Sequence, residues 1–505
     1  MEQKKINNFV NKLLIIFLII QPIFDIKIFY NSTSTLIRVL IIFILFIYYF
    51  FTSKNNKKYY FLIYPFILGI YFVFHHLNAL NFNSLVPGNF NYSIIKELLY
   101  FAKMVTPYLL IYNLYKSNIE RDKIIKVIQI IVLTITLAII VTNLLGISYG
   151  NYSDVKIKAN FFQWFNKETN YTYIDLASKG IFEYGNQIGA ILAMLLPFII
   201  YKVIEDRKFI NIFAIVCNVF GLILLSTRVS VLSVFIVITY TLFAFYFIAI
   251  IHKKKFAIKS YMPIIIVLIL YSMLLPINPM FSRLNERENV IEAFNEEQSI
   301  IKDVSKEKTE IETERQDENI QEIEILEKTE QIDKETNFMI QYIEENYQSK
   351  KIHKQFLFEN YPYVYDYEFW YNFLQNDITL TTDYRYIETS MIKRIVEINN
   401  NKGDKLFGIT NTRLQNVFNI ERDFVVQYYA LGVIGIVLIF LPYLLILTKF
   451  AYESISKKLK NLDEVKLVSG ITIMFVFCIS YFSGNMLNSL GFTIYFTLCF
   501  YLLKG

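Results

Sequence analysis

The chain has 505 residues, of which 54% are hydrophobic and 17% aromatic, and its formal net charge at pH 7 is +6. This composition excludes a soluble globular protein. The apolar runs are continuous rather than alternating, which excludes a transmembrane β-barrel and predicts an all-α polytopic membrane protein.

A bilayer core about 30 Å thick needs ~20 apolar residues per helix. Twelve runs of the sequence meet that requirement, so we predict twelve transmembrane helices. They span residues 10–30, 36–52, 59–77, 94–115, 124–147, 183–203, 208–227, 229–251, 260–277, 424–448, 465–483 and 486–503. No small-residue cleavage site follows the first run, and we therefore expect it to be a retained helix.

Every second loop between the predicted spans is basic. The basic residues of these loops are Lys54, Lys57, Lys58, Lys116, Arg121, Lys123, Lys126, Lys202, Arg207, Lys208, Lys253, Lys254, Lys255, Lys259, Lys457, Lys458 and Lys460. The positive-inside rule places these loops and both chain ends in the cytoplasm. The loops at 78–93, 148–182 and 278–424 then face outward.

The richness in Asn, Ile, Lys and Tyr is typical of an AT-rich bacterial genome, so we expect the cytoplasmic membrane of a bacterium.

The three cysteines, Cys217, Cys478 and Cys499, all fall inside predicted helices. We therefore expect no disulfide in the outer loops. No CxxC or His-rich spacing indicates a metal site, and we expect neither a metal nor another cofactor.

One large polar segment interrupts the apolar pattern. Residues 1–277 hold the first nine predicted spans, residues 278–423 form an extracytoplasmic loop domain, and residues 424–505 hold the last three. Between Arg283 and Asp423 there are 30 acidic and 18 basic residues, a net charge of −12. A membrane protein with one such domain between two spans is expected to build its reaction site there, at the membrane surface.

The loop domain divides into three parts. Residues 286–345 are rich in Glu with a thin apolar stripe, and predict either a solvated helical or disordered insert or a mobile lid. Residues 355–374 are dense in Tyr, Phe and Trp, and predict an interfacial belt, a small packed subdomain or a platform on which sugar rings stack. Residues 383–423 begin with an amphipathic helical pattern and are the predicted catalytic segment.

Four features follow one another in a characteristic order. They are YGNQIGAILAMLLP at 184–197, LLSTRVSVLS at 224–233, a large outer loop that runs from Arg385 to an LFG at 406–408, and IERDFVVQYYALGVIG at 420–435. In this order they resemble the O-antigen ligase and polymerase superfamily, in the form found in Gram-positive capsule or teichuronic-type glycan assembly. The resemblance covers about residues 180–440.

The resemblance implies a twelve-helix, metal-independent glycosyltransferase of the C type (GT-C). Such an enzyme moves a glycan from an undecaprenyl diphosphate carrier to an acceptor hydroxyl on the outer face of the membrane. The expected partners are therefore the lipid-linked donor, the glycan acceptor, membrane lipids and chain-length regulators or other assembly proteins, with no nucleic acid.

A diphosphate donor requires positive charge at the outer edge of the bilayer, and arginine binds phosphate oxygens through two parallel hydrogen bonds. Arg228 lies at the outer junction of two apolar spans, where an ionisable group is a functional hypothesis, although a snorkelling Arg is the alternative. Arg385 is the next candidate, and pairing with Asp383 or Glu388 is its alternative. Arg394 and Arg413 are further candidates for the same role.

An attacking sugar hydroxyl needs a general base. In Gram-negative ligases of the resembling family a histidine fills this role just before the next helix, but IERDF here contains none, and the loop's only histidine is His353. We predict that Glu421, and after it Asp423, takes that role, because a carboxylate beside an apolar span can have a raised pKa. Capping of the following helix is the alternative for both.

Other polar groups fall inside the spans. Asn186 and Gln187 lie among glycines, which predicts close helix packing, and in the resembling family this helix lines the central cavity. On the fourth span, Lys103 and its neighbours Lys96 and Glu97 indicate either internal pairing or a second headgroup site. His75 and His76, at the outer end of the third span, are interpreted as interfacial rather than as ligands.

With what the resemblance implies, our interpretation is a polymerase of undecaprenyl-diphosphate-linked oligosaccharide repeats on the outer face of the cytoplasmic membrane. A ligase that transfers a glycan to a lipid, wall or protein acceptor is the alternative within the enzyme class. A lipid-linked glycan flippase is the alternative outside it, although inverted repeats and short loops would then be expected.

Overall fold

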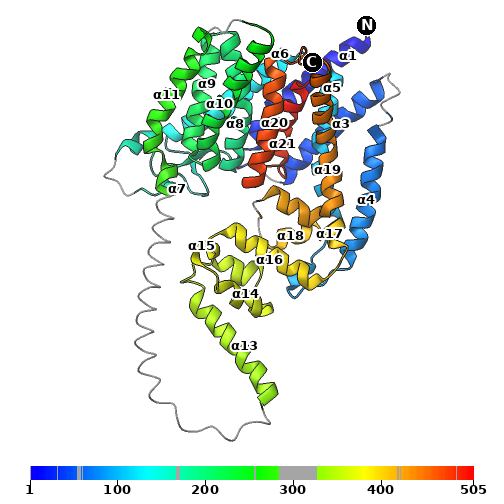
Figure 1. Cartoon of the computed structure of the whole chain (residues 1–505), viewed down its shortest axis with the longest axis vertical. Coiled ribbons are helices and arrows are strands. Elements are labelled where there is room, and N and C mark those ends of the chain that lie inside the picture. Colours follow the sequence, from blue (N-terminus) through cyan, green and yellow to red (C-terminus); the bar gives the residue numbers. More distant parts are fainter. Residues whose placement is uncertain are drawn as a thin grey trace.

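The computed structural model describes residues 2–30, 32–53, 59, 61–166, 171–254, 258–283, 327–417, 420, 422–484 and 486–504. A bundle of long helices forms one end of the molecule and a smaller helical domain forms the other (Figure 1). Both chain ends lie at the end of the bundle that is farther from the small domain. The ends of the chain and the small domain therefore lie at opposite ends of the molecule, while their sides of the membrane stay predictions.

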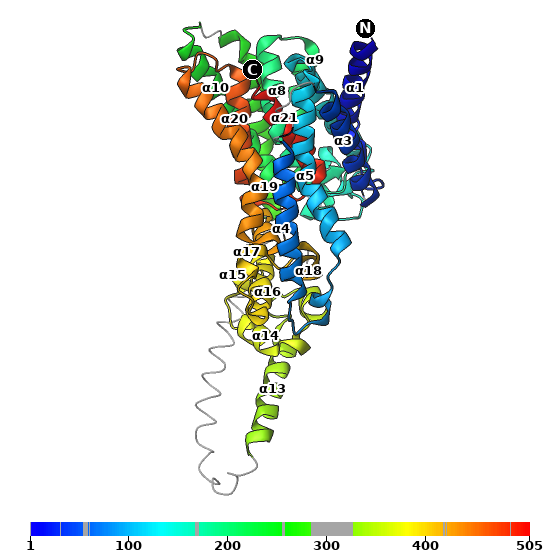
Figure 2. The ribbon, with the colours of Figure 1, turned by 90° about the vertical axis from the view of Figure 1, so that its right-hand side faces the viewer.

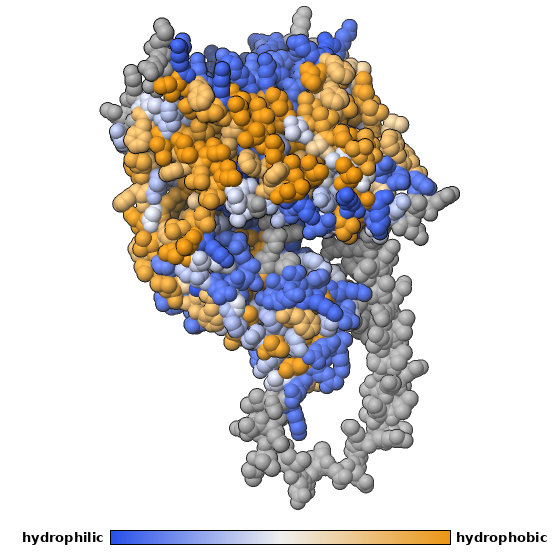
Figure 3. Space-filling view, turned by 180° about the vertical axis from the view of Figure 1, so that it is seen from behind, coloured by the Kyte–Doolittle hydropathy of each residue, from blue (hydrophilic) through white to orange (hydrophobic). Residues whose placement is uncertain are grey.

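The bundle follows the predicted spans. Its helices are α1 (Glu2–Ile19), α2 (Gln21–Phe24), α3 (Ser32–Thr52), α4 (Ile63–Leu80), α5 (Ile94–Ser117), α6 (Arg121–Leu144), α8 (Gly185–Glu205), α9 (Phe209–Leu225), α10 (Arg228–Ile251), α11 (Met262–Leu274), α19 (Asp423–Ser456), α20 (Glu464–Phe482) and α21 (Leu490–Leu502). Each predicted span overlaps at least one of them. Eight described helices are long and apolar enough to cross a membrane. Figure 3 shows the resulting apolar belt, with hydrophilic surface above and below it.

Helix α8 forms the centre of the bundle, and its residues from Ile188 to Ile200 are almost completely buried. A continuous apolar helix of this kind is stable only when neighbours cover all its faces. Close packing is possible because Gly189 has no side chain: a Cβ there would lie 3.1 Å from Cβ of Ser230 on α10. The expectation of tight glycine-mediated packing on this helix agrees with that distance.

The described part of the chain is not purely helical. Strands β1 (Tyr149–Gly150) and β2 (Ser178–Gly180) form a small antiparallel sheet in the loop between α6 and α8, which also contains α7 (Tyr173–Leu176). The side chain of Asn151 donates a hydrogen bond to the carbonyl of Leu225 at 2.6 Å. This loop therefore closes over the ends of α8 and α9.

The small domain is built from the second half of the loop region. Its helices are α13 (Glu327–Asn346), α14 (Tyr367–Leu374), α15 (Ile378–Thr381), α16 (Tyr384–Asn399), α17 (Asp404–Phe407) and α18 (Asn411–Val417), with a π-helical turn at Gln355–Asn360 and a 3₁₀ turn at Tyr363–Tyr365. Most of the predicted acidic insert, residues 284–326, lies outside the described residues.

The aromatic block 355–374 and α16 pack into one apolar core. Trp370 and Tyr361 are completely buried, and the indole Nε1 of Trp370 donates to the carbonyl of Tyr361 at 2.7 Å. Ile387 and Met391 of α16 belong to the same cluster, which continues into α4, α5 and α19. The small domain therefore shares its core with the membrane helices rather than hanging from them as a separate unit.

Helices α4 and α19 run side by side from the bundle into the small domain (Figures 1 and 2). The Tyr64 hydroxyl of α4 donates to the carbonyl of Leu438 on α19 at 3.0 Å, and Tyr71 donates to Leu431 at 2.5 Å. These bonds hold α4 and α19 together and so fix the position of the small domain relative to the bundle.

Helix α19 is broken at Gly432, whose φ of 64° and ψ of −178° are not helical. The LFG segment fills the break: the amides of Ile409 and Thr410 donate to the carbonyls of Tyr429 and Ala430 at 2.8 and 3.1 Å. Gly408 makes this approach possible, because its φ is +78° and a Cβ there would lie 2.2 Å from the carbonyl oxygen of Ala430. Carbonyl groups left without helical partners are thus satisfied by the loop domain.

Candidate functional site

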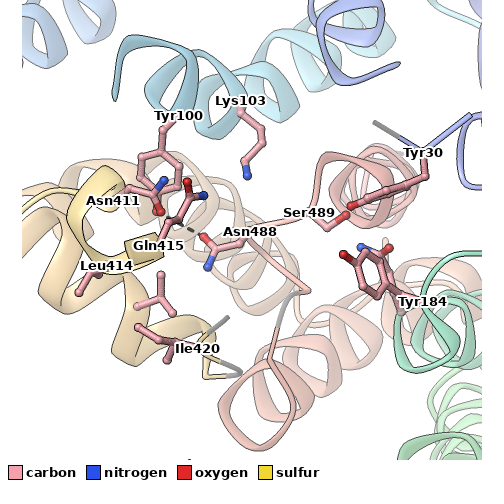
Figure 4. A pocket seen from close by; sticks show the side chains of 12 residues that line it. Tyr30, Tyr100, Lys103, Tyr184, Asn411, Leu414, Gln415, Ile420, Asn488 and Ser489 are labelled. Atoms are coloured by element: carbon pink, nitrogen blue, oxygen red, sulfur yellow. Dashed lines mark hydrogen bonds between the residues drawn. The ribbon is translucent and has the colours of Figure 1, made fainter. Parts of the chain in front are cut away.

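A cavity of about 330 Å³ lies where the bundle meets the small domain (Figure 4). Its walls come from α5, the start of α8, α18, the start of α19 and the segment before α21. The lining residues are Tyr30, Tyr100, Lys103, Tyr184, Gln187, Asn411, Leu414, Gln415, Ile420, Val426, Asn488 and Ser489. Amides, hydroxyls and one ammonium group dominate this list, so the cavity suits a polar, anionic ligand.

Helix α5 supplies the positive charge. Lys103 lies one turn from Tyr100, and its ammonium group is 5.5 Å from the centroid of the Tyr100 ring. Figure 4 shows this ammonium group pointing into the cavity. The carboxylate of Asp423 interacts with it electrostatically.

Helix α18 is held against α5 by Glu97. This fully buried carboxylate accepts hydrogen bonds from the amides of Asn411 and Thr412 at 3.0 and 3.1 Å, and from the Thr412 hydroxyl at 2.8 Å. A buried carboxylate is stable when its oxygens accept several such bonds. The bonds place Asn411 and, one turn later, Gln415 at the cavity wall.

His75 lies behind Glu97 and is also completely buried. Its Nε2 is 3.2 Å from Oε1 of Glu97, and its Nδ1 is 2.6 Å from the carbonyl oxygen of Phe407. The prediction of an interfacial position for His75 is therefore wrong: the ring joins α4, α5 and α17 inside the protein. The local sequence around His75 could not indicate this burial, because its partners Glu97 and Phe407 are distant in sequence.

Asp423 organises the opposite wall. Its Oδ2 accepts hydrogen bonds from the amides of Met486 and Leu487, both at 2.9 Å. The next two residues, Asn488 and Ser489, line the cavity, and Asn488 accepts a bond from the Tyr100 hydroxyl at 3.3 Å. The first residue of α19 thus fixes the segment that leads into α21.

A buried ion pair lies beside this segment. Arg38 of α3 contacts Asp25 at 2.6 Å and donates through Nε to Gln21 at 2.9 Å, and both charged side chains are almost fully buried. A Cβ on Gly491 of α21 would lie 2.5 Å from the Asp25 carboxylate. The pair therefore ties α2, α3 and α21 together inside the bundle, next to Tyr30.

Two of the predicted site residues, Gln187 and Asp423, help to form the cavity. Gln187 lines it, whereas Asn186 points to the adjacent loop and accepts a bond from Tyr152 at 2.8 Å. Asp423 is buried and acts through residues 486 and 487. Glu421 lies outside the described residues.

None of the four predicted phosphate-binding arginines lines this cavity. Arg228 is exposed at the first position of α10. Arg385 donates to the carbonyl of Phe482, at the end of α20, at 2.7 Å. The guanidinium of Arg394 binds both oxygens of Asp366, at 2.8 and 3.0 Å, and this bidentate pairing raises the pKa of Arg394.

Arg413 is buried between α18 and the end of α4. It donates to the carbonyl of Ala79 at 2.8 Å, and its guanidinium carbon is 4.2 Å from the centroid of Phe82 and 5.1 Å from that of Tyr92. Burial lowers the pKa of Arg413 to about 10. This arginine is therefore held by aromatic rings and backbone rather than presented to a ligand.

Several cavity residues were not singled out from the sequence, among them Tyr100, Asn411, Gln415 and Asn488. Tyr100 lies inside α5, Asn411 and Gln415 lie on α18, and Asn488 lies in the connection before α21, so only the fold brings them together. Lys103 did carry a signal, because it is a cation within an apolar span. Among the described residues no three His, Cys, Asp or Glu side chains are grouped to hold a metal ion.

One family model matches nearly the whole chain. Residues 7–504 fit the model described as O-antigen ligase like membrane protein. No curated protein and no solved structure matches the chain.

Proposed function

Because the chain belongs to the family of O-antigen ligase like membrane proteins, we propose that it is a glycosyltransferase that polymerises undecaprenyl-diphosphate-linked oligosaccharide repeats on the outer face of a bacterial cytoplasmic membrane. The family supports glycan transfer in general. Polymerisation, the undecaprenyl diphosphate carrier and the outer face of the membrane as the place of reaction are what we propose beyond the family.

The observation that carries the proposal is the position of Lys103. Its ammonium group points into a polar cavity at the height where the apolar bundle ends and the small domain begins (Figure 4). A lipid diphosphate has its chain in the bilayer and its charged group at the membrane surface, and the proposal puts the cavity at that level. As the sugar–phosphate bond breaks, negative charge grows on the departing diphosphate, and a fixed cation stabilises it.

The remaining lining residues suit a glycan. Gln187, Asn411, Gln415 and Asn488 present amides, which donate to and accept from sugar hydroxyls, and Tyr184 and Tyr30 form an edge-to-face pair at 5.2 Å. Aromatic faces bind the apolar faces of sugar rings. Positive charge and amides on neighbouring walls therefore fit a donor that joins a diphosphate to a sugar.

The attacking hydroxyl of the acceptor must lose a proton. We assign this proton to Glu421, which is two residues before Asp423 in sequence. Asp423 is assigned a positioning role, because its Oδ2 is already engaged by two backbone amides. Lys103, rather than a metal ion, balances the charge of the leaving group in this scheme.

The four arginines enter the proposal differently. Arg228 is the first residue of α10, and Arg385 of the small domain contacts the end of α20. Their proposed role is to attract the anionic donor toward the cavity. Arg394 and Arg413 are engaged inside the small domain, and their proposed contribution is to its shape.

The test uses the purified full chain in detergent with a lipid-linked repeat unit as donor and acceptor. The expected product is a ladder of longer glycans that remain on the lipid. Transfer of a single glycan to a different added acceptor, with no ladder, would support a ligase. A flippase would give no new glycosidic bond in detergent.

Lys103→Gln is the informative variant. Removal of a fixed charge that stabilises the leaving group should lower the rate of transfer by about 100-fold. The matched control is Lys96→Gln, on the same helix but exposed, which should leave the rate unchanged. If Lys103→Gln retains full activity in a folded protein, the assignment of the diphosphate to this cavity is wrong.

A further inference from the structure

A second cavity lies at the other end of the bundle, near the C-terminus. It is a groove of about 430 Å³ between α5 and α19, and the residues after α21 close one side. Its lining residues are Phe61, Tyr108, Ile111, Tyr112, Tyr115, Pro442, Ile446, Lys449, Phe450, Glu453, Leu503 and Lys504. Its volume is within the range of small-molecule sites, roughly 300–1,000 Å³.

The inner part of the groove is apolar and aromatic. Ile111 of α5 faces Ile446 and Phe450 of α19 across it. The hydroxyl of Tyr112 is buried and forms no hydrogen bond with any described residue. A buried donor of this kind costs free energy unless a ligand supplies an acceptor.

The rim of the groove is positively charged. Lys504 donates to the carbonyl of Tyr115 at 3.0 Å and to Asn118 at 2.9 Å, which leaves one of its three N–H groups for a further acceptor. Burial, and then the neighbouring charge of Lys116, lowers the pKa of Lys504. Lys116 does not line the groove, but its charge adds to the positive potential around Lys504.

The other side of the rim is less crowded. Lys449 has a side chain that is 76% exposed and lies 3.9 Å from Glu453, a weak pair for two groups at the surface. Glu453 is the one acidic residue among the lining residues of this groove. The charge of the rim is therefore positive on balance, above an apolar and tyrosine-rich interior.

We propose that this groove binds one anionic phospholipid, with an acyl chain between α5 and α19 and the phosphate between Lys504 and Lys449. The hydroxyl of Tyr112 then donates to an ester oxygen of the lipid. Apolar walls explain why the ligand is a lipid rather than a free phosphate, and the lysines explain why its headgroup is anionic. This proposal is independent of the reaction at the opposite end of the bundle.

The test measures lipid retention on the full-length protein. Delipidated protein is mixed with phosphatidylglycerol or phosphatidylcholine, and native mass spectrometry counts the lipids that stay bound. Wild-type protein should retain one phosphatidylglycerol and little phosphatidylcholine. The double variant Lys449→Gln/Lys504→Gln should weaken retention of phosphatidylglycerol by roughly 10- to 30-fold. This estimate assigns a factor of about 3 to 5 in affinity to each lysine near an anionic lipid headgroup.

Two further variants control the result. Lys208→Gln removes an exposed charge at the same end of the bundle, where Lys208 pairs with Asp206, and should leave retention unchanged. Ile446→Trp fills the groove without altering its charge and should also lower retention.

Equal retention of the two lipids, an equal loss in Lys208→Gln, or full retention in Ile446→Trp would overturn the proposal. Competition by millimolar inorganic phosphate would show a phosphate site instead and would overturn it as well. If the double lysine variant does not fold, Ile446→Trp and the comparison of the two lipids still decide the question.

Discussion

Glu97 of α5 and Thr412 of α18 are joined by two hydrogen bonds, in which Oε2 of the buried carboxylate accepts from the amide at 3.1 Å and from the hydroxyl at 2.8 Å. The two residues are 315 positions apart. Through them a membrane helix determines where a helix of the small domain begins, and with it one wall of the proposed reaction cavity.

The first prediction concerns this contact. Glu97→Gln replaces one acceptor oxygen with an NH₂ group, which places a donor against a donor of residue 411 or 412. Because hydrogen bonds to a buried charged group are lost, we expect the free energy of unfolding to fall by about 2–3 kcal/mol. Thermal unfolding in detergent, followed by tryptophan fluorescence, measures the change.

Glu205→Gln is the matched control, because the side chain of Glu205 is 42% exposed and pairs with Lys202 at the surface. Its effect should stay within ~0.5 kcal/mol. If both variants unfold at the wild-type temperature, Glu97 does not hold α18.

The second prediction concerns Gly408. Its φ of +78° and the distance of 2.2 Å from an added Cβ to the Ala430 oxygen leave no room for a side chain. Gly408→Ala should separate the LFG segment from the break in α19, with a loss of more than ~3 kcal/mol in stability.

Gly88→Ala tests whether the effect is specific, since an added Cβ at Gly88 meets no atom within 4 Å. We expect this variant to be neutral or nearly so. A comparison of yield and unfolding temperature after purification separates the two, and equal behaviour would contradict the predicted backbone clash.

The third prediction concerns the ion pair between Arg394 and Asp366. Asp366 is almost fully buried, so Arg394→Ala leaves a buried carboxylate with only the Tyr361 hydroxyl and the helix amide to balance it. With Arg394 30% exposed, solvent reduces the loss, and we expect about 1–3 kcal/mol.

Arg394→Lys restores the charge but not the two parallel bonds, and should recover only part of the loss. Limited proteolysis of the small domain is a sensitive measurement. Protease resistance equal to wild type in Arg394→Ala would mean that the pair is not structural, and would reopen the assignment of Arg394 to the donor.

The fourth prediction separates structure from catalysis at Asp423. Asp423→Asn keeps an oxygen that can accept from the amides of Met486 and Leu487, whereas Asp423→Ala removes it and leaves both amides buried. We expect a loss of about 1 kcal/mol for the first variant and about 2–4 kcal/mol for the second.

The rate of glycan transfer gives the second measurement. A positioning role predicts that Asp423→Asn retains at least about a tenth of wild-type activity, while loss of a general base costs roughly 10²- to 10⁴-fold. A large fall in rate without a fall in stability would make Asp423, rather than Glu421, the base.

Much of the bundle could be predicted because membrane helices follow from composition. Each predicted span overlaps a helix, and α8 packs closely against α10 at Gly189, as the glycines of this helix predicted. The family resemblance is confirmed by a match over residues 7–504. The number of helices that cross the bilayer, and the position of the small domain on its outer side, stay predictions.

The site was predicted less well, because a charged residue in the sequence does not show which group it pairs with in the fold. Arg413 and Arg394 were further candidates for a phosphate contact because they are basic residues in an acidic loop. The structure places Arg413 against two aromatic rings, and Arg394 binds Asp366. Lys103 was left with two interpretations, and only its direction in the fold, into the cavity, favours a ligand over internal pairing.

That this protein is helical, membrane-embedded and interrupted by one large polar loop follows from its composition. An apolar run of about 20 residues satisfies its backbone hydrogen bonds locally and needs no distant partner. Which polar groups meet depends on how the helices are packed. Glu97 with Thr412, Asp423 with Met486, and Lys103 with Asn411 and Asn488 come together from distant parts of the chain. Their pairing depends on how helices pack and where α19 breaks, and no local pattern of residues records that.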